Sequence, residues 1–535
     1  MSTSSNDNAP LLRSTTSRRN SQHIDQQPST GLGEWWRSRS RDALSLFSLL
    51  LLLGIGLGIW VYGTLPTSDQ DENPHEYALS TDRIYEHLIQ LQTIASQHNN
   101  SRSVATGHKA SAEYVIEHLK EHGNCDVYVQ RFVSPVWTLK GTPRLGVRGD
   151  VKLDYIWSTD FQVLRYGGQG ADIKEAPAVE INGCKHLQDV DGKVAVVQSH
   201  AGCTSFELAY ALEQKGAKAV LFIMSPRFKT PSRARVRLVD WKEGDPLMTI
   251  PVLSATSSVG QLLQSLGDGA LLNIHVDSSI KEVKTHNVIC VGRTGDPNNT
   301  IVVGSHLDSV SAGPGLNDNG SGSMSTLEIQ LTLARIAHKP HNRLVFAWWA
   351  AEEDGLLGSR HFARVLAHGW ENRWSKEDKL PFTWKDIALN LNFDMLASPN
   401  YIALVHNGSD APKNARLGSQ RIQRVFEDYF VRHGYPYQIT DMLAGSDFLP
   451  FVDNGVPAGG VLTGASEIKS IEDRRVHGGL ANAPLDTCYH QDCDTLLNIN
   501  RQALTKMSKA AMYAVSTLSS MRDLREELEK GMHSI

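Results

Sequence analysis

The chain has 535 residues, too many for one typical core, so two or more folded units are expected. Its 41% apolar and 21% charged residues are ordinary for a globular protein. The formal net charge of -5 gives no basic excess that would favour nucleic acid as a partner, and six cysteines are too few for a disulfide scaffold.

The start of the chain separates into a polar tail, an apolar segment and a linker. Residues 1–43 are rich in Ser, Asn and Arg, which predicts a disordered cytosolic tail. Residues 44–63 carry no charge, and as a helix they would span about 30 Å, the thickness of a bilayer core. A buried globular helix or a cleaved signal peptide fits this pattern less well. Arginines within 37–41 precede the segment and acids follow in the linker 64–79, which predicts a type II transmembrane helix.

Two short patterns concern location. The stretch DNAPLL, residues 7–12, has an acid four residues before a Leu-Leu pair and resembles the dileucine signal that diverts type II proteins to vacuoles or lysosomes. Glycosylation sequons begin at Asn99, Asn298 and Asn407. We therefore expect the catalytic part to be luminal, in a vacuole- or lysosome-like compartment.

Helical and strand patterns begin after the linker. Apolar residues recur on one helical face from Ile84 to Ile94, and Ser80 or Thr81 can cap this helix. A second helix is predicted at 111–121 and a strand at 125–132.

The pattern changes between residues 165 and 279. We expect a compact module here, inserted into a larger domain of residues 80–164 and 280–530. The predicted elements of the insert are strands at 192–198, 218–224 and 249–255 and helices at 206–217 and 259–267.

The larger domain alternates apolar strands with helices. Such runs predict an α/β fold with a mixed, largely parallel sheet that is flanked by helices. The predicted strands are 300–310, 343–353, 387–396 and 457–465, and the clearest helices are 321–339 and a last one at about 500–530.

Polar side chains stand where these strands end. In a parallel sheet, ligands bind at the carboxyl ends of the strands. Each side chain alone is weak evidence, because a His or Asp at such a place is usually an ordinary hydrogen-bonding or capping residue. Together, two imidazoles and several carboxylates at one rim predict a metal centre, and the candidates are His306, Asp308, Asp318, Glu352, Glu353, Asp394 and His490.

Mixed nitrogen and oxygen ligands suit zinc, and two zinc ions that share one carboxylate form a hydrolytic centre. Such a pair needs five or six protein ligands, and this number is supplied by His306, Asp318, Glu353, Asp394 and His490. The remaining acid, Glu352, can then accept a proton from the attacking water.

The ordered motifs identify a family. His306–Asp308 and the stretches NDNGSGS, AAEE, NFDM and CYHQ resemble the double-zinc aminopeptidases, which include bacterial leucine-type enzymes and fungal aminopeptidase Y. The resemblance covers about 80–165 and 280–520 and implies a zinc exopeptidase fold. It implies that His306 and Asp394 bind one zinc ion, that Glu353 and His490 bind the other, that Asp318 bridges them, and that Glu352 is the general base for a water between the metals.

The resemblance also implies roles for two further residues. Asp308 would hold the ring of His306, and the hydroxyl of Tyr489 would donate to the oxyanion, although ordinary aromatic packing is the alternative for Tyr489. One departure concerns substrate contacts: the family commonly has an arginine before the Ser446-Asp447 pair, and this chain has Ala444-Gly445 there. Asn319, whose sequon falls in the Asp318 loop, is not expected to carry a glycan.

The insert resembles the protease-associated (PA) domain found within this family, which carries no catalytic residue and shapes access to the cleft. The resemblance implies disulfides between Cys488 and Cys493, around His490, and between Cys184 and Cys203 in the insert. Pairing of the last two cysteines, Cys125 and Cys290, is left open. This cysteine usage is typical of a non-cytosolic compartment.

The preferred reading is a membrane-anchored zinc aminopeptidase that acts on peptides with a free N-terminus and binds two zinc ions. A carboxypeptidase or dipeptidase of the glutamate carboxypeptidase type is the main alternative, although such proteins carry a large helical domain after the catalytic one. A receptor of the transferrin-receptor type would lack zinc ligands, and the insert argues against a single-zinc glutaminyl cyclase. The preferred terminal residue and the oligomeric state are not determined by the sequence.

Overall fold

One sheet of 14 strands connects the elements of the described chain. The structure is a computed structural model that describes residues 75–185, 187–199, 203–232, 236, 241–369, 379–442 and 445–531. The predicted tail 1–43 and anchor 44–63 lie outside these residues. Among the helices that are described, none has both the length and the apolar character needed to cross a membrane.

The centre of the sheet is parallel. Strand β9 (Asp296–His306) lies between β10 (Asn342–Trp349) and β11 (Ile387–Phe393) and is parallel to both, and β11 is parallel to β14 (Ala458–Leu462). On the far side of β10, β8 (Leu271–Gly292) runs antiparallel. The four strands predicted for the larger domain correspond to β9, β10, β11 and β14. The predicted mixed, largely parallel α/β architecture is confirmed. The sheet continues beyond β14 through β12 (Leu404–His406) to β13 (Gln438–Thr440).

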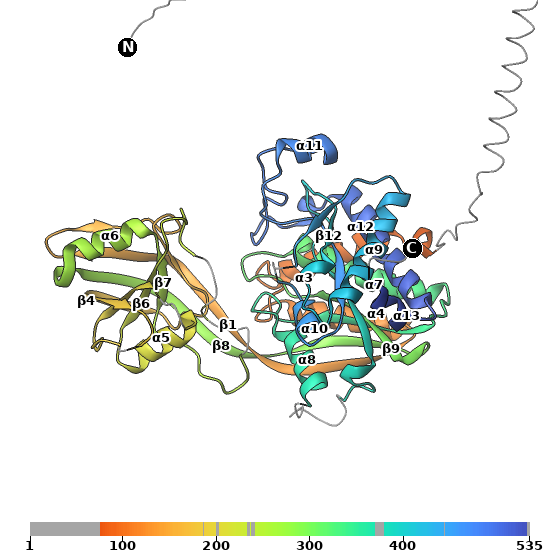
Figure 1. Ribbon diagram of the computed structural model, residues 1–535, viewed down its shortest axis with the longest axis horizontal. Helices are drawn as coiled ribbons and strands as arrows, with labels where there is room; N and C mark the ends of the chain where they lie inside the picture. Colours follow the sequence, from red (N-terminus) through yellow and green to blue (C-terminus); the bar gives the residue numbers. More distant parts are fainter. Residues whose placement is uncertain are drawn as a thin grey trace, which may run out of the picture. The chain divides into compact units, whose positions relative to one another are not determined.

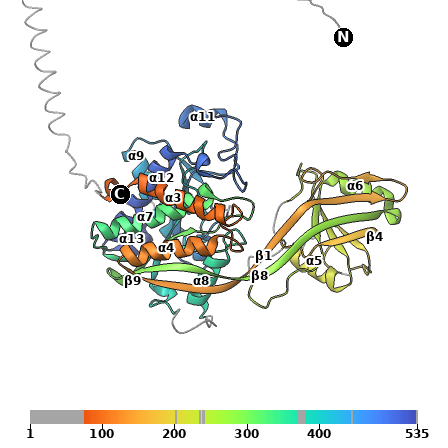
Figure 2. The ribbon, with the colours of Figure 1, turned by 180° about the vertical axis from the view of Figure 1, so that it is seen from behind.

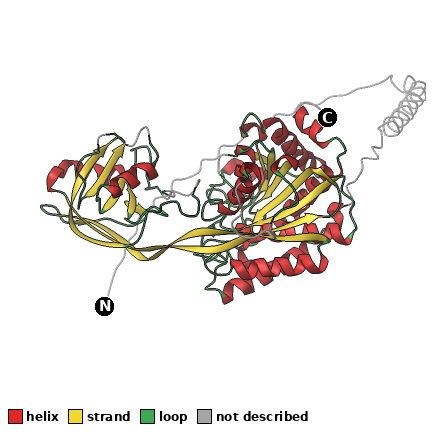
Figure 3. Ribbon diagram, turned by 90° about the horizontal axis from the view of Figure 1, so that it is seen from below, coloured by secondary structure: helices red, strands yellow, loops and turns green. Residues whose placement is uncertain are grey.

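Helices cover both faces of this sheet, as Figure 3 shows. Successive side chains of β10 alternate between two apolar cores: Phe346 and Trp348 pack in one core, and Ala347 and Trp349 pack in the other. Burial on both faces explains why the strand reads as a continuous apolar run. The second core is closed by α8 (Leu357–His368) and α10 (Leu449–Asp453). Five helices, several of which lie side by side in Figure 2, close the first core: α3 (Thr81–Gln97), α4 (His108–His122), α7 (Gly322–Arg335), α9 (Arg416–Arg432) and α12 (Arg501–Ser520).

The N-terminal helix forms as its sequence predicts. The hydroxyl of Ser80 accepts a hydrogen bond from the backbone nitrogen of Arg83 at 3.3 Å and caps α3. Leu88 and Leu91, on the predicted apolar face, are fully buried. A short helix, α2 (His75–Ala78), precedes α3.

The predicted last helix, 500–530, is instead two helices, α12 and α13 (Leu524–Lys530). The side-chain amide of Asn342 donates to the carbonyl oxygens of Leu518 and Met521 at 2.9 and 2.6 Å. The backbone nitrogen of His341 donates to the carbonyl of Ser519 at 2.8 Å. These contacts satisfy the last carbonyl groups of α12, which ends there.

Strands β1 (Cys125–Arg148) and β8 pair antiparallel along most of their length and lead into the insert (Figure 1). Strand β1 is therefore much longer than the predicted strand at 125–132. Because Leu145 and Val147 of β1 pack with Leu253 and Val259, the core of the insert includes residues before 165, where we expected the module to begin. Its other elements are β2 (Leu153–Asp154), β3 (Phe161–Val163), β4 (Ala171–Asn182), β5 (Val194–Ser199), α5 (Ser205–Gln214), β6 (Ala219–Ile223), β7 (Val252–Ala255) and α6 (Ser257–Leu266).

All six cysteines form disulfides. The two expected pairs, Cys184–Cys203 and Cys488–Cys493, are present, and the pair left open by the sequence, Cys125–Cys290, joins β1 to β8 with a Cα–Cα distance of 5.6 Å. This disulfide closes the end of the long two-stranded ribbon within the larger domain.

Candidate metal centre

The side chains predicted at the strand ends gather at one edge of the sheet. β9 ends at His306, β10 at Trp349 just before Glu352 and Glu353, and β11 just before Asp394. Asp318 lies in the irregular turn Leu316–Ser321 that leads into α7, and His490 lies in a loop near the C-terminus. The topology therefore brings together residues that are up to 184 positions apart in the sequence, from His306 to His490.

These residues form two groups that share one carboxylate. Nε2 of His306 lies 3.3 Å from Oδ1 of Asp318 and 3.2 Å from Oδ1 of Asp394. Nε2 of His490 lies 3.1 Å from Oδ2 of Asp318 and 3.3 Å from Oε2 of Glu353. Within each group the potential ligand atoms lie within 4.8 Å of one another. The two oxygens of Asp318 thus face two different histidines, an arrangement that suits a carboxylate bridging two metal ions.

The charges of the site also favour a cation. Burial opposes protonation of His306, but Asp394 and Glu352 outweigh it and raise its pKa well above the usual value. Burial likewise opposes protonation of His490, and the carboxylates of Glu353 and Asp318 raise its pKa to about 11. The carboxylates therefore create a strongly negative potential, which divalent cations can neutralise. Two imidazoles and three carboxylates are a donor set that fits zinc.

The neighbouring glutamates have opposite electrostatic environments. Burial, together with the charges of Glu353 and Asp447, raises the pKa of Glu352 well above its usual value. Burial also acts on Glu353, but the nearby His490 outweighs it and lowers the pKa of that carboxyl. Two acids whose pKa values are pushed apart are suited to different tasks.

The loop that carries Asp318 is held by amides on both sides of it. Asn319 accepts a hydrogen bond from the backbone nitrogen of Met395 at 3.1 Å and donates to the carbonyl of Phe393 at 2.9 Å. Asn317 accepts from the backbone nitrogen of Ala397 at 3.0 Å. The Asn-Asp-Asn sequence thereby fixes Asp318 against the segment that carries Asp394. Asn319 is fully buried, so its sequon is inaccessible.

Asp308 supports both His306 and the paired glutamates. Its carboxylate accepts hydrogen bonds from the backbone nitrogens of Glu352 at 3.1 Å and Glu353 at 3.3 Å. Nδ1 of His306 lies 3.1 Å from the backbone carbonyl oxygen of Asp308 and 3.9 Å from its carboxylate. The expected contact to the ring thus involves the main chain of Asp308, while its side chain holds the turn after β10.

Tyr489 packs against its neighbour in the sequence. Its ring stacks on the ring of His490 with a centroid distance of 3.8 Å. Burial and the charges of Asp318 and Glu353 raise the pKa of Tyr489, so its hydroxyl remains protonated and able to donate. The Cys488–Cys493 disulfide closes the loop that carries both residues.

Comparison with known proteins identifies the family. Residues 287–515 match the profile of Peptidase family M28. An aminopeptidase of Pseudomonas aeruginosa (strain UCBPP-PA14) is 34% identical over 458 residues, which cover 82% of this chain and 81% of that protein. The probable leucine aminopeptidase 2 of Aspergillus fumigatus is 32% identical over 443 residues, covering 81% of this chain and 82% of that protein. The chain belongs to peptidase family M28.

Solved structures support the fold of this M28 peptidase. An aminopeptidase from Aneurinibacillus sp. strain AM-1 superposes with a TM-score of 0.61 at 22% identity, covering 82% of this chain and 94% of that one. A zinc aminopeptidase from Bacillus subtilis gives a TM-score of 0.53 at 20% identity, covering 83% and 96%. The predicted membership in an aminopeptidase family, the zinc exopeptidase fold and the enzyme class, a metallo-aminopeptidase, are confirmed.

Three supporting residues of the M28 peptidase were missed in the sequence. The guanidinium of Arg102, fully buried, donates to the backbone carbonyls of Leu307, Pro314 and Gly315. Asp494 accepts from the backbone nitrogen of Asp318 at 3.0 Å, and Ser446 donates to Oδ2 of Asp394 at 2.8 Å. Ser446 belongs to the Ser446-Asp447 pair and Asp494 directly follows Cys493, whereas Arg102 stands in a polar stretch with no such signal.

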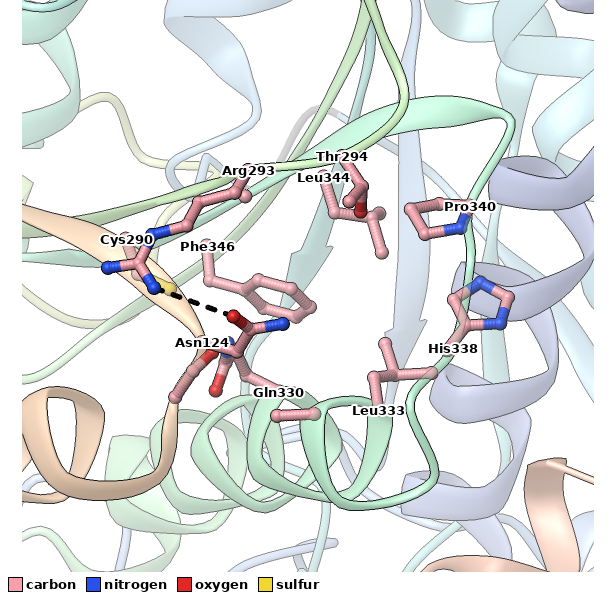
Figure 4. A pocket seen from close by; sticks show the side chains of 13 residues that line it. Asn124, Cys290, Arg293, Thr294, Gln330, Leu333, His338, Pro340, Leu344 and Phe346 are labelled. Carbon is pink, nitrogen blue, oxygen red and sulfur yellow. Dashed lines mark hydrogen bonds between the residues drawn. The ribbon is translucent and has the colours of Figure 1, made fainter.

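The pocket drawn in Figure 4 is separate from this site. Gln330 and Leu333 of α7, Cys290 of β8 and Phe346 of β10 line it, and Arg293 donates to Asn124, a second lining residue, at 3.5 Å. Its lining contains none of the predicted site residues.

Proposed function

We propose that this M28 peptidase is an aminopeptidase with two zinc ions, one held by His306 and Asp394, the other by Glu353 and His490, and both by Asp318. The observation that carries the proposal is the position of Asp318, whose Oδ1 and Oδ2 lie 3.3 and 3.1 Å from Nε2 of different histidines. One structural neighbour, a zinc aminopeptidase from Bacillus subtilis, and the imidazole and carboxylate donors of the two groups support zinc dependence.

The protein side chains divide the work of hydrolysis. When bound, the metal ions supply Lewis-acid activation of the substrate carbonyl and of the attacking water. Glu352, which is not among the five proposed ligands, accepts the proton of that water and passes it to the leaving amine. The hydroxyl of Tyr489, which remains protonated, donates a hydrogen bond to the developing oxyanion.

We propose further that the substrate is a peptide with a free N-terminus. A cluster of carboxylates is suited to a cationic α-amine, and acetylation of that amine removes its charge and adds bulk. A carboxypeptidase would need a basic clamp for the terminal carboxylate. Gly445 stands before Ser446-Asp447, where the family resemblance leads us to expect an arginine, and this argues mildly against such a clamp.

The test uses the purified full-length protein and three forms of one pentapeptide: free, N-acetylated and C-amidated. We expect release of the N-terminal residue from the free and amidated forms and none from the acetylated form. Release of a C-terminal residue from the acetylated form would assign the protein to the carboxypeptidases and refute the proposed specificity.

A second proposal concerns location. We propose that residues 44–63 anchor the protein with residues 1–43 in the cytosol, that the stretch DNAPLL directs it to a vacuole- or lysosome-like compartment, and that the PA-like insert limits access to the cleft. If Asn99 or Asn298, both exposed, is luminal, treatment with a glycosidase will lower the mass of the protein. An unchanged mass together with extraction by alkaline carbonate would contradict the anchor.

The sorting signal has its own test. Replacement of both Leu11 and Leu12 by alanine will alter the steady-state location of a tagged chain, and an unaltered location would refute the sorting signal.

A further inference from the structure

Two side chains of the insert contact the segment that carries the paired glutamates. The guanidinium of Arg165 donates to the backbone carbonyl of Glu353 at 2.8 Å and lies 3.7 Å from the carboxylate of Asp354. The hydroxyl of Tyr166 donates to the same carboxylate of Asp354, and lies 3.3 Å from the carbonyl oxygen of Pro135. These contacts reach the residues directly after the proposed general base, Glu352.

The contact is also an apolar interface. Tyr166 and Trp241 are 1% and 2% exposed, and both pack in a cluster with Ala350 and Ala351, which directly precede Glu352. The backbone carbonyl of Trp241 in turn accepts a hydrogen bond from Arg364 of α8 at 2.8 Å. The insert therefore packs on the turn between β10 and α8 on both sides of the glutamates.

This turn has a backbone conformation that needs support. Ala351 and Leu356 have positive φ angles of 57° and 61°, in a region that is unfavourable for a residue with a side chain. The turn is closed by hydrogen bonds from the backbone nitrogens of Gly355 to Glu352 and of Leu357 to Ala351, at 2.8 and 3.0 Å. From the larger domain, the carboxylate of Asp308 holds it, as described above. Arg165 and Tyr166 hold it from the insert.

The two contacting residues are themselves fixed to the core of the insert. Leu164 is buried in that core, and its backbone nitrogen donates to the carbonyl of Val252 at 2.9 Å. The carbonyl of Arg165 accepts from the backbone nitrogen of Val236 at 2.9 Å. A displacement of the insert would thus be transmitted to the turn through residues 164–166.

We propose that Arg165 and Tyr166 are positioning residues for Glu352 and Glu353, so that the insert is part of the catalytic framework as well as a cover for the cleft. The inference rests on the proposed roles of the two glutamates. It goes beyond them because it assigns a catalytic consequence to residues of a module that carries no reacting group.

The test compares Tyr166→Phe and Arg165→Met with matched changes elsewhere in the same region, Tyr155→Phe and Arg144→Met. Phenylalanine keeps the packing of Tyr166 and removes only its hydroxyl. Arg165→Lys serves as the conservative variant, because an ammonium can still donate to the carbonyl of Glu353. The measurements on the full-length protein are kcat and KM for the free pentapeptide, the midpoint of thermal unfolding, and amide hydrogen exchange of residues 350–357.

We expect kcat to fall about 10- to 100-fold in Tyr166→Phe and Arg165→Met with KM within about twofold, because small displacements of catalytic groups have effects of this size. Exchange at residues 350–357 should become faster than in the control variants, and Arg165→Lys should recover part of the loss. Unchanged kcat and exchange would overturn the inference, as would faster exchange spread evenly over the whole chain. If the wild-type protein released no N-terminal residue, the proposed function would fail, and the exchange comparison would still decide this inference.

Discussion

Arg102 provides the sharpest test of how the metal centre is held. Its guanidinium is fully buried and donates to three backbone carbonyls of the segment between His306 and Asp318, with distances of 2.8 Å to Pro314 and 2.5 Å to Gly315. Burial lowers the pKa of Arg102 to about 10, against the opposing effect of Asp308 and other acids, so the side chain is cationic at neutral pH. Arg102 therefore supplies hydrogen-bond donors to the three backbone carbonyls and a positive charge near the acids of the site.

The cost of removing these interactions can be worked out from the contacts. In Arg102→Met each of the three carbonyls loses a buried donor, at about 1–3 kcal/mol each, and part of this is offset because a charge is no longer buried. A net loss of about 3–5 kcal/mol follows, typical of breaking a buried charged network. With an unfolding entropy of about 2.1 cal/mol/K per residue, the loss lowers the unfolding midpoint of the larger domain, residues 80–164 and 280–530, by roughly 4–7 °C.

The assay is thermal unfolding at neutral pH, with bound zinc measured on the same samples. Arg102→Lys should lie between the wild type and Arg102→Met, because a single ammonium cannot serve three carbonyls in a planar fork. Arg144→Met, at an exposed arginine of β1, is the control. An unfolding midpoint of Arg102→Met within about 2 °C of the wild type, with unchanged zinc, would show that the loop is held without Arg102.

The remaining predictions concern the base, the pH dependence and the disulfide. Glu352→Gln should lower turnover at least ~100-fold and keep its zinc, whereas Glu353→Gln should lose zinc; equal zinc contents in the two variants would contradict the assignment. Burial lowers the pKa of His361 to about 4, so protonation favours the unfolded state and stability falls as the pH drops from about 6.5 towards 4. His361→Gln should therefore show a smaller fall of the unfolding midpoint with pH, and an identical fall would refute this account. Replacing both Cys488 and Cys493 by serine should cost about 2 kcal/mol for so short a loop and weaken zinc binding, and unchanged zinc affinity would show that the disulfide does not position the loop.

The central strands could be predicted because they are buried on both faces, which produces apolar runs such as residues 343–349. The length of β1 could not, because Pro135 and Pro143 interrupt its pattern. Pro135 lies opposite Glu282 of β8, and at this position none of the described strands pairs with the other side of β1, so it is an edge strand there and tolerates proline.

The break between α12 and α13 was also beyond local reasoning. It depends on hydrogen bonds from His341 and Asn342, more than 170 residues earlier in the chain. Helical periodicity continues through the break, so the sequence around it contains little to mark the end of α12.

The candidate ligands could be predicted because metal chemistry restricts the residue types and the sheet places them at strand ends. The supporting contacts depend on three-dimensional detail. Arg102 acts through backbone carbonyls, which leave no trace in the sequence, and the carboxylate of Asp308 holds backbone nitrogens of the turn rather than the ring of His306. The contacts of Arg165 and Tyr166 join two parts of the chain whose packing no local pattern encodes.

The central claim is that one carboxylate, Asp318, is shared by two zinc ions, and the zinc content per chain tests it most directly. Zinc should be measured by mass spectrometry after extensive dialysis, for the wild type and for Asp318→Ala. The account predicts about two zinc ions per wild-type chain and fewer than about one in Asp318→Ala, because both sites lose a ligand at once. One zinc ion per wild-type chain, or an unchanged content in Asp318→Ala, would contradict it.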